Sequence, residues 1–111
     1  MKRQGRSVKL YLVDGTATGI LTAEIMNWTG HVLAAPRTRF EDAFSRDELK
    51  RTGVYFLFGP DDEGTDLGKV YVGEGDEIGK RLYQHNKDKP FWERFIAVTS
   101  KDMNLTKAHV R

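Results

Sequence analysis

The stretch Gly53-Val54-Tyr55-Phe56-Leu57-Phe58-Gly59 is an almost uninterrupted run of apolar and aromatic side chains between two glycines. A short apolar run of this kind, bounded by turn residues, predicts a β-strand that is buried on both faces. Residues 59–68 form a polar loop with a proline and several aspartates, and residues 69–73 then predict a second strand. The two strands indicate a hairpin with a long loop.

The rest of the C-terminal half continues with helix and strand patterns after this hairpin. Residues 77–87 have the periodicity of a helix, and residues 94–99 predict a third strand. Residues 105–111 begin the pattern of another helix.

The N-terminal half predicts a different local order. We expect a strand over residues 8–13, and a short helix that begins at Thr18 and ends near residues 28–30. An apolar run over residues 32–35, closed by a proline, predicts the next strand. One or two short helices are expected over residues 37–51 from two capping-box patterns, Thr38 with Glu41 and Ser45 with Glu48.

These elements predict a fold that contains both helices and strands (α/β in the broad sense), and more narrowly one of the α+β class. Its centre would be a small, mainly antiparallel three-stranded sheet flanked by helices, preceded by a short N-terminal β-α-β unit. We therefore divide the chain into an extension of unassigned role, residues 1–51, and a module that carries the sheet, residues 52–111. The total of 111 residues, 39% of them hydrophobic, suits one compact unit with a single core.

The composition excludes several function classes. The chain has no cysteine, so it has no thiol nucleophile, disulfide, thiolate zinc site or iron–sulfur cluster. No apolar run approaches the roughly 20 residues needed to span a bilayer. We expect a cytoplasmic protein without membrane contact. The net charge of +2 does not by itself indicate a nucleic-acid binder.

The helix predicted over residues 77–87 carries the first candidate functional residues. A rotation of about 100° per residue places Ile78, Arg81, Leu82 and His85 within a third of the helix circumference. Because Ile78 and Leu82 must pack on the sheet, Arg81 and His85 are carried to the edge of the core. This position also suits an arginine that snorkels along its aliphatic stem and a boundary histidine without function.

The two strands and this helix together have the residue order of a known family. Gly53-Val54-Tyr55 on one strand and Tyr71-Val72-Gly73 on the next are followed by Gly79-Lys80-Arg81-Leu82, and then by His85. This ordered set resembles the GIY-YIG nuclease superfamily over residues 52–111. One departure is Glu74, since the family often has a lysine soon after the second motif.

The resemblance implies a metal-dependent endonuclease that hydrolyses DNA phosphodiester bonds, in DNA repair or restriction. It implies that Tyr55 and Tyr71 orient the attacking water and the phosphate, that Arg81 neutralises transition-state charge, and that His85 assists. An arginine suits this role because it offers two parallel N–H donors and a permanent charge. A phenol with a pKa of about 10 is a poor base at neutral pH, and tyrosines on buried strands are usually core residues.

The resemblance also implies one Mg²⁺ or Mn²⁺ ion and no nucleotide cofactor. The family holds the metal through a glutamate on the helix after the third strand, which suits a hard cation. Residues 105–111 contain no carboxylate, so we expect this glutamate beyond Arg111 and expect the 111-residue chain to be inactive without it.

DNA is the expected partner, and lysines in the motif-bearing half are candidate phosphate contacts. A solvated lysine surface is the equally weighted alternative. These lysines are Lys80, Lys87, Lys89, Lys101 and Lys107. His31 and His109 have no comparable context, and we interpret both as structural. The competing functional interpretation is a catalytically inactive DNA-binding or protein-interaction module on the same fold, which Glu74 and the missing metal ligand favour.

Overall fold

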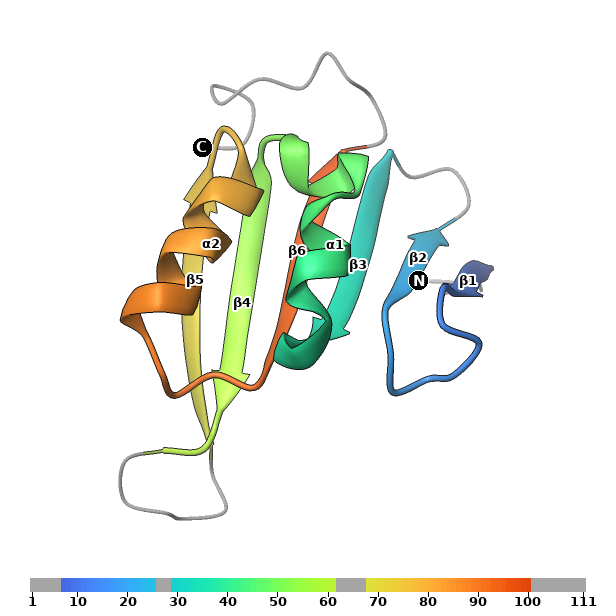
Figure 1. Ribbon diagram of the computed structural model, residues 1–111. Helices are drawn as coiled ribbons and strands as arrows, with labels where there is room; N and C mark the ends of the chain where they lie inside the picture. Colours follow the sequence, from blue (N-terminus) through green and yellow to red (C-terminus); the bar gives the residue numbers. More distant parts are fainter. Residues whose placement is uncertain (1–6, 26–28, 62–67, 101–111) are drawn as a thin grey trace, which may run out of the picture.

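The computed structural model describes residues 7–25, 29–61 and 68–100. Within these residues the fold is α+β, with one six-stranded antiparallel sheet in the order β1-β2-β3-β6-β4-β5 (Figure 1). The strands are β1 (Val8–Leu12), β2 (Leu21–Ile25), β3 (Gly30–Pro36), β4 (Gly53–Gly59), β5 (Lys69–Gly75) and β6 (Arg94–Ser100). The helices are α1 (Phe40–Phe44) and α2 (Ile78–Asp88), with 3₁₀ turns η1 (Arg37–Arg39) and η2 (Asp47–Lys50).

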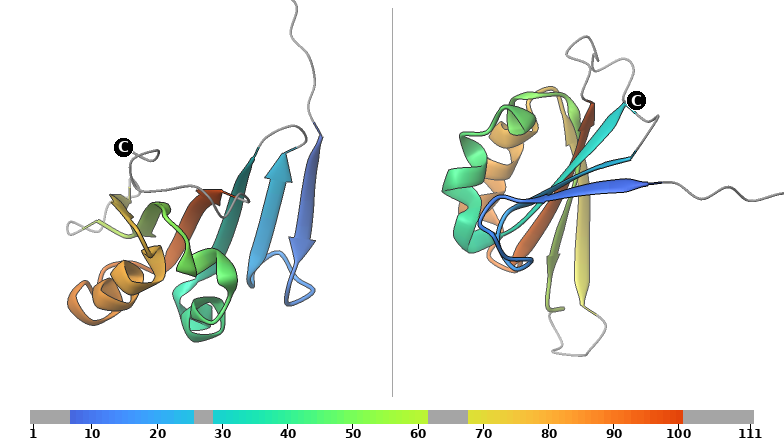
Figure 2. Two further views of the ribbon diagram at one scale, coloured as in Figure 1. Left: turned by 90° about the horizontal axis from the view of Figure 1, so that it is seen from above. Right: turned by 90° about the vertical axis from the view of Figure 1, so that its right-hand side faces the viewer.

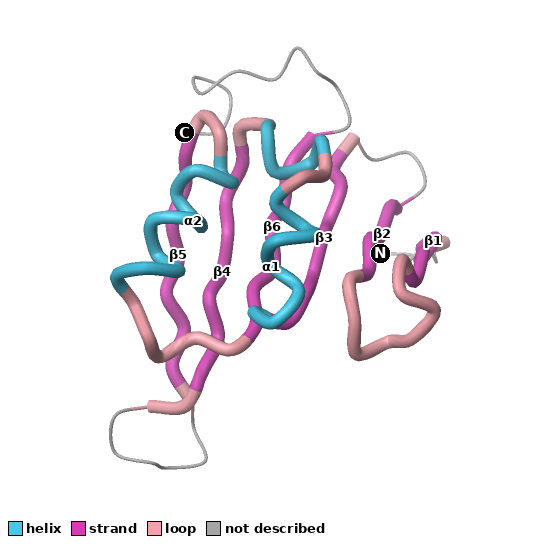
Figure 3. The backbone as a smooth tube through the Cα atoms, viewed as in Figure 1, coloured by secondary structure: helices cyan, strands magenta, loops and turns pink. Residues whose placement is uncertain are grey.

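Both α-helices lie on one face of the sheet, α1 over β3 and β6 and α2 over β4 and β5 (Figure 2). The chain passes from β3 through the short helices into β4, and from β5 through α2 into β6 (Figure 3). The core lies between the sheet and these helices. Its largest fully buried side chains are Trp92, Tyr55, Phe95, Ile20, Leu33, Leu49, Leu57, Ile78 and Leu82.

The other face of the sheet has no helix over it within the described residues, and we call it the open face. The strand register places apolar side chains from every strand on it. Several of these side chains are exposed, including Leu10 at 61% and Val72 at 58%. The apolar residues of the open face include Val8, Leu10, Leu12, Leu21, Ala23, Val32, Ala34, Val54, Phe56, Phe58, Val70, Val72, Ile96 and Val98.

The central hairpin and the helix that follows it are confirmed, but β4 is fully buried on its helix-covered face only, not on both faces as predicted. The predicted three-stranded sheet is wrong. β1, β2 and β3 extend the sheet beyond β6, because β3 pairs with β6 along its whole length, from Gly30 with Ser100 to Pro36 with Arg94. Residues on both sides of position 51 therefore contribute strands to the same sheet. No helix among the described residues is long and apolar enough to cross a membrane.

The N-terminal β-α-β unit is also corrected, because the segment expected to be a helix forms β2. Leu21 and Ala23 alternate with Thr22 and Glu24, which is the period of a strand. Pairing with β1 on one side and β3 on the other satisfies the backbone of β2 on both edges. This tertiary pairing outweighs the local capping signal at Thr18.

The short helices over residues 37–50 are confirmed, but the capping boxes that predicted them do not form. Arg39 and Arg46 stand at the N-terminal ends of α1 and η2, and neither makes a side-chain cap. Glu48 instead bonds to His31 on β3 and to Arg46, so its carboxylate joins η2 to the sheet.

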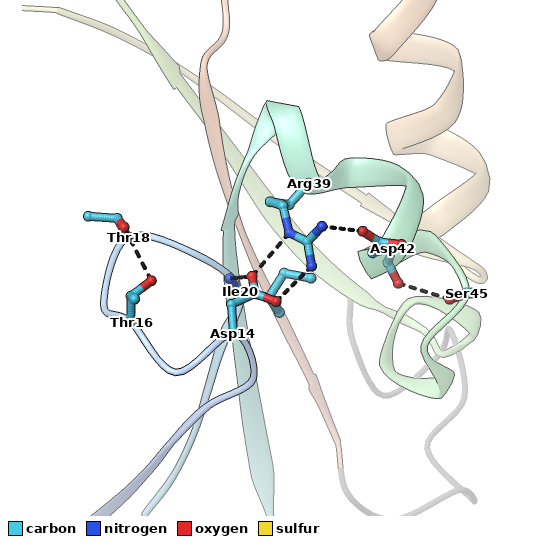
Figure 4. Close-up of polar contacts among 7 residues, drawn as sticks. All are labelled: Asp14, Thr16, Thr18, Ile20, Arg39, Asp42 and Ser45. Carbon is cyan, nitrogen blue, oxygen red and sulfur yellow. Dashed lines mark hydrogen bonds and ion pairs between the residues drawn. The ribbon is translucent and has the colours of Figure 1, made fainter.

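The turn between β1 and β2 is fixed by the carboxylate of Asp14 (Figure 4). Its Oδ2 accepts hydrogen bonds from the backbone N–H of Ile20 at 2.9 Å and from Arg39 Nε at 3.0 Å. Arg39 also donates to Asp14 Oδ1 at 2.6 Å and to Asp42. The hydrogen bond from Arg39 lowers the pKa of Asp14. The β1–β2 hairpin is thereby tied to η1 and the start of α1.

Candidate active site

The two motif tyrosines lie on neighbouring strands and on the helix-covered face. Tyr55 on β4 pairs with Gly73 on β5, and Tyr71 pairs with Leu57, so the tyrosines are diagonal neighbours across the two strands. Their ring centroids are 6.3 Å apart with an interplanar angle of 29°. Side chains alternate along a strand, so both rings face α2.

Gly73 allows Tyr55 to lie across β5. A Cβ atom at position 73 would be 2.3 Å from the Tyr55 hydroxyl oxygen and 2.4 Å from Cζ of the same ring. No side chain fits at those distances. Tyr55 of the first motif can therefore pack here only because the second motif ends in a glycine, Gly73. The two motifs form one packing unit.

Helix α2 brings His85 against this pair of rings. Ile78 and Leu82 are fully buried and fix the helix on the core, as the helical spacing predicts. His85 is 8% exposed, and its Nε2 lies 2.7 Å from the hydroxyl of Tyr55, which has no exposed surface. The His85 ring also meets the Tyr71 ring edge-on, with centroids 5.0 Å apart. His85 is therefore a buried partner of both tyrosines.

Arg81, one turn earlier on α2, completes a chain of hydrogen bonds. Its side chain crosses Gly75, where a Cβ would be 2.9 Å from Arg81 Cγ, and its guanidinium hydrogen-bonds the Tyr55 hydroxyl. Arginine only donates, so the Tyr55 oxygen accepts from Arg81 and its own hydrogen remains for His85 Nε2. We call this arrangement the Arg81–Tyr55–His85 chain.

The protonation states agree with this direction of hydrogen bonding. Burial lowers the pKa of His85, and the positive charges of Lys89 and Arg81 lower it further. His85 is therefore neutral at pH 7 and can accept a hydrogen bond. Burial raises the pKa of Tyr55 against the opposing effect of the Arg81 hydrogen bond, so Tyr55 is a neutral phenol.

The accessible groups around this buried pair are cationic or phenolic. Arg81 is exposed and Tyr71 is half-buried. Lys89, which directly follows α2, places its Nζ over the Tyr71 ring at 4.6 Å from the centroid. The cationic side chains of Arg81 and Lys89 and the phenol of Tyr71 thus lie together beside the buried Tyr55–His85 pair. This arrangement suits an anion such as phosphate.

The structure separates the five lysines that were candidate DNA contacts. Lys89 lies at the tyrosine cluster, whereas Lys80 pairs with Glu77 at 3.5 Å and Lys87 lies over the Tyr83 ring at 4.6 Å. The other two, Lys101 and Lys107, lie outside the described residues. The described part of the chain therefore brings one of these lysines to the same place as Tyr55, Tyr71, Arg81 and His85.

The described residues contain no cluster of metal ligands. In residues 7–25, 29–61 and 68–100, no group of three or more histidine, aspartate or glutamate side chains could hold a metal ion. Glu74 is on β5 between Gly73 and Gly75, so it faces away from Tyr71. The glutamate expected beyond Arg111, and the helix expected before it, lie outside the described residues.

Arg37 is a positioning residue that the sequence did not reveal. Its guanidinium donates to the side chain and the carbonyl of Asn86 at 2.8 and 2.7 Å and to the carbonyls of Lys89, Pro90 and Trp92 at 3.1–3.2 Å. It also stacks over the Trp92 ring at 4.4 Å. Arg37 therefore fixes the backbone that carries Lys89.

Comparisons of the chain with protein-family models, curated proteins and solved structures give no match.

Proposed function

We propose that the chain binds DNA and hydrolyses its phosphodiester bonds, using Arg81, Tyr71 and Lys89 to hold the scissile phosphate. The observation that carries this proposal is the Arg81–Tyr55–His85 chain, which joins the GVY strand to α2 and packs against Tyr71 of the YVG strand. Its contacts with the buried Tyr55 and with Gly75 limit the directions that the exposed Arg81 guanidinium can take, and a fixed cation stabilises developing charge better than a mobile one.

Arg81 would act on the transition state. Its fork can bond two non-bridging oxygens of a phosphate, and its charge persists at every physiological pH. Lys89 adds a second cation at the Tyr71 ring, and the half-buried Tyr71 can donate its hydroxyl to phosphate or water. These three groups would provide the positive charge and the hydrogen-bond donors that stabilise the phosphate.

Tyr55 and His85 would act as positioning residues. Tyr55 has no exposed surface, so it reaches the substrate through Arg81 rather than by direct contact. His85, neutral at pH 7 because burial lowers its pKa, keeps the Tyr55 hydroxyl in place. The proposal thus gives the two motif tyrosines different roles, although they are close neighbours.

The resemblance adds one Mg²⁺ or Mn²⁺ ion to the proposal. The described residues form no site for this ion, so no step is assigned to it, and the test varies the ion instead.

The test is nicking of supercoiled plasmid with Mg²⁺, with Mn²⁺ and with EDTA. Both the 111-residue chain and a form that includes any residues encoded after Arg111 should be assayed. Arg81→Ala should lower the nicking rate by about 100-fold or more, the usual effect of removing one transition-state donor. Lys80→Ala is the matched control on the same helix, since Lys80 pairs with Glu77 away from the tyrosines. Full activity of Arg81→Ala contradicts the proposal.

The second candidate function is a DNA-binding or protein-interaction module without catalysis. It is favoured by Glu74, which stands where the resembled family often has a lysine. Salt-dependent DNA binding without nicking by either form selects the DNA-binding module. Absence of DNA binding selects the protein-interaction module.

A further inference from the structure

A polar cavity lies on the helix-covered side of the sheet, beyond the edge of the helices. Strands β1 and β2 extend past α1, so their side chains on this side have no helix over them (Figure 2). The cavity has a volume of about 310 Å³. Its floor is formed by β1, β2 and β3, and its wall by η2 and the residue before it. The lining residues are Lys9, Tyr11, Thr22, Glu24, His31, Arg46 and Glu48.

His31 and Glu48 form the buried wall of the cavity. Each residue is 8% exposed, and His31 Nε2 lies 2.9 Å from Glu48 Oε2. Arg46 bonds both oxygens of the same carboxylate, at 3.2 and 3.1 Å. Burial opposes ionisation of Glu48, but the bonds from Arg46 and His31 outweigh it and lower its pKa. The Glu48 carboxylate is therefore ionised, and both of its oxygens are hydrogen-bonded within the protein.

The other nitrogen of His31 lacks a hydrogen bond. Nδ1 is buried without a hydrogen-bond partner, and the nearest carboxylate oxygen is Glu24 Oε1 at 3.3 Å. His31 thus holds its two ring nitrogens beside two carboxylates, Nε2 beside Glu48 and Nδ1 beside Glu24. Because Nδ1 is buried, a ligand in the cavity meets the partly exposed Glu24 carboxylate, whose two oxygens accept N–H donors.

The charges around the cavity select an uncharged ligand. Lys9 and Arg46 balance Glu24 and Glu48, so neither a free phosphate nor an ammonium ion is favoured by net charge. Tyr11 is 61% exposed and offers a ring for stacking. The volume is at the lower end of small-molecule sites, which run from about 300 to 1,000 Å³. A planar heterocycle with both donors and acceptors meets these conditions.

We propose that this cavity binds an unpaired guanine base of the DNA substrate. Guanine carries two adjacent donors, N1–H and the N2 amino group, beside the O6 acceptor. The two donors would bond the two carboxylate oxygens of Glu24, Lys9 would donate to O6, and Tyr11 would stack on the ring. No other DNA base has two adjacent donor nitrogens on its pairing edge, so the cavity should prefer guanine.

The identity of the ligand as a DNA base rests on the proposed function, and the sheet geometry links the two sites. His31 is in register with Thr99 on β6, Thr99 with Gly53 on β4, and Gly53 with Gly75 on β5, which contacts Arg81. Three strand spacings give a distance of roughly 14 Å between positions 31 and 75. A strand whose phosphate lies at Arg81 can place a nearby base in the cavity.

The first measurement is an NMR titration of the 111-residue chain with guanosine, inosine, adenosine and cytidine. Guanosine should give saturable shifts at the cavity residues and bind at least about 10-fold more tightly than adenosine or cytidine, the effect of one good base contact. Inosine, which lacks the N2 amino group, should bind more weakly than guanosine. Equal shifts with all four nucleosides, or none, overturn the proposal.

Variants give the second measurement. Glu24→Gln replaces an acceptor pair by one acceptor and a donor, and should abolish the preference for guanosine. Glu77→Gln, at the exposed N-terminal end of α2, is the control and should leave it unchanged. Retention of the preference in Glu24→Gln contradicts the assigned contacts.

The third measurement separates this inference from the proposed function. Oligothymidine with one central guanine should bind at least about 10-fold more tightly than oligothymidine alone, and this difference should vanish in Glu24→Gln. Guanine-dependent binding without plasmid nicking supports the cavity and contradicts the nuclease. Nicking without any guanine preference supports the nuclease and overturns the cavity.

Discussion

The hydroxyl oxygen of Tyr55 lies 2.7 Å from Nε2 of His85, and both side chains are buried. The first residue belongs to β4 and the second to α2, so this hydrogen bond joins the sheet to the helix that covers it. It also determines which groups remain accessible, because Arg81 bonds the same hydroxyl from the solvent side. The bond therefore links the stability of the core to the placement of a surface cation.

Tyr55→Phe should lower both stability and activity. The substitution leaves His85 Nε2 as a buried acceptor without a partner, which costs about 1–3 kcal/mol. It also removes the acceptor that fixes Arg81. Urea unfolding measures the first effect and plasmid nicking the second. In Tyr71→Phe, the half-buried ring should keep nearly all of its stability, so equal destabilisation by the two substitutions would contradict the assigned hydrogen bond.

Gly73→Ala should destabilise the protein by overpacking. The new Cβ would lie 2.3 Å from the Tyr55 oxygen, and the ring has no free space to move into because Tyr55 is fully buried. Overpacked sites typically cost about 1–3 kcal/mol. Val72→Ala, the adjacent position on the open face, is the control for the loss or gain of strand propensity. An unfolding midpoint of Gly73→Ala equal to that of wild type would refute the steric argument.

His85 should titrate below its ordinary pKa of 6.5 in the folded protein. Because the folded pKa is depressed, neutral His85 contributes stability that is present above about pH 6.5 and is lost as the pH falls below that value. Lys89→Met removes one of the charges that lower this pKa, so the pKa should rise, while Lys80→Met should leave it unchanged. Titration of the imidazole signals by NMR measures both values. A His85 pKa above 6.5 in wild type would contradict the described burial.

Arg37→Lys should destabilise the loop that carries Lys89, although it keeps the charge. A single ammonium cannot reach Asn86 and the carbonyls of the 89–92 segment together, and each lost charged hydrogen bond is worth about 1.5–3 kcal/mol. Hydrogen exchange at the amides of residues 89–93 should accelerate. Arg94→Lys, at an exposed position on β6, is the control. Identical exchange rates in both variants would contradict the positioning role of Arg37.

The parts of the structure that depend on local periodicity could be predicted from the sequence. The β4–β5 hairpin and the buried face of α2 follow from residues within one element, and the motif order placed Tyr55, Tyr71, Arg81 and His85 together. β2 was missed because the capping signal at Thr18 outweighed the short alternation of Leu21 and Ala23 with Thr22 and Glu24, and its pairing on both sides is not marked by any local pattern. The contacts of Arg37 with Asn86 and Trp92 join segments far apart in the chain, and no local pattern marks them.

The cavity around His31 was missed for a related reason. His31 and Glu48 meet only because η2 folds back over β3, whereas Glu48 on its own has the spacing of a helix cap. The interpretation of His31 as a structural residue, made from the sequence, explains its bond to Glu48. It does not account for the contact of Nδ1 with Glu24 at 3.3 Å across the β2–β3 pair, which is visible only in three dimensions.

The open face has a practical consequence for folding assays. Dyes such as anilinonaphthalene sulfonate brighten on exposed apolar surface, and their fluorescence is commonly taken as a sign of a molten globule. Here the native sheet itself presents Leu10, Val70 and Val72 to solvent. We expect dye fluorescence from the fully folded protein, reduced in Val72→Thr with an unfolding free energy within about 0.5 kcal/mol of wild type. For this chain, a bright dye signal should be accepted as evidence of unfolding only when near-ultraviolet circular dichroism changes with it.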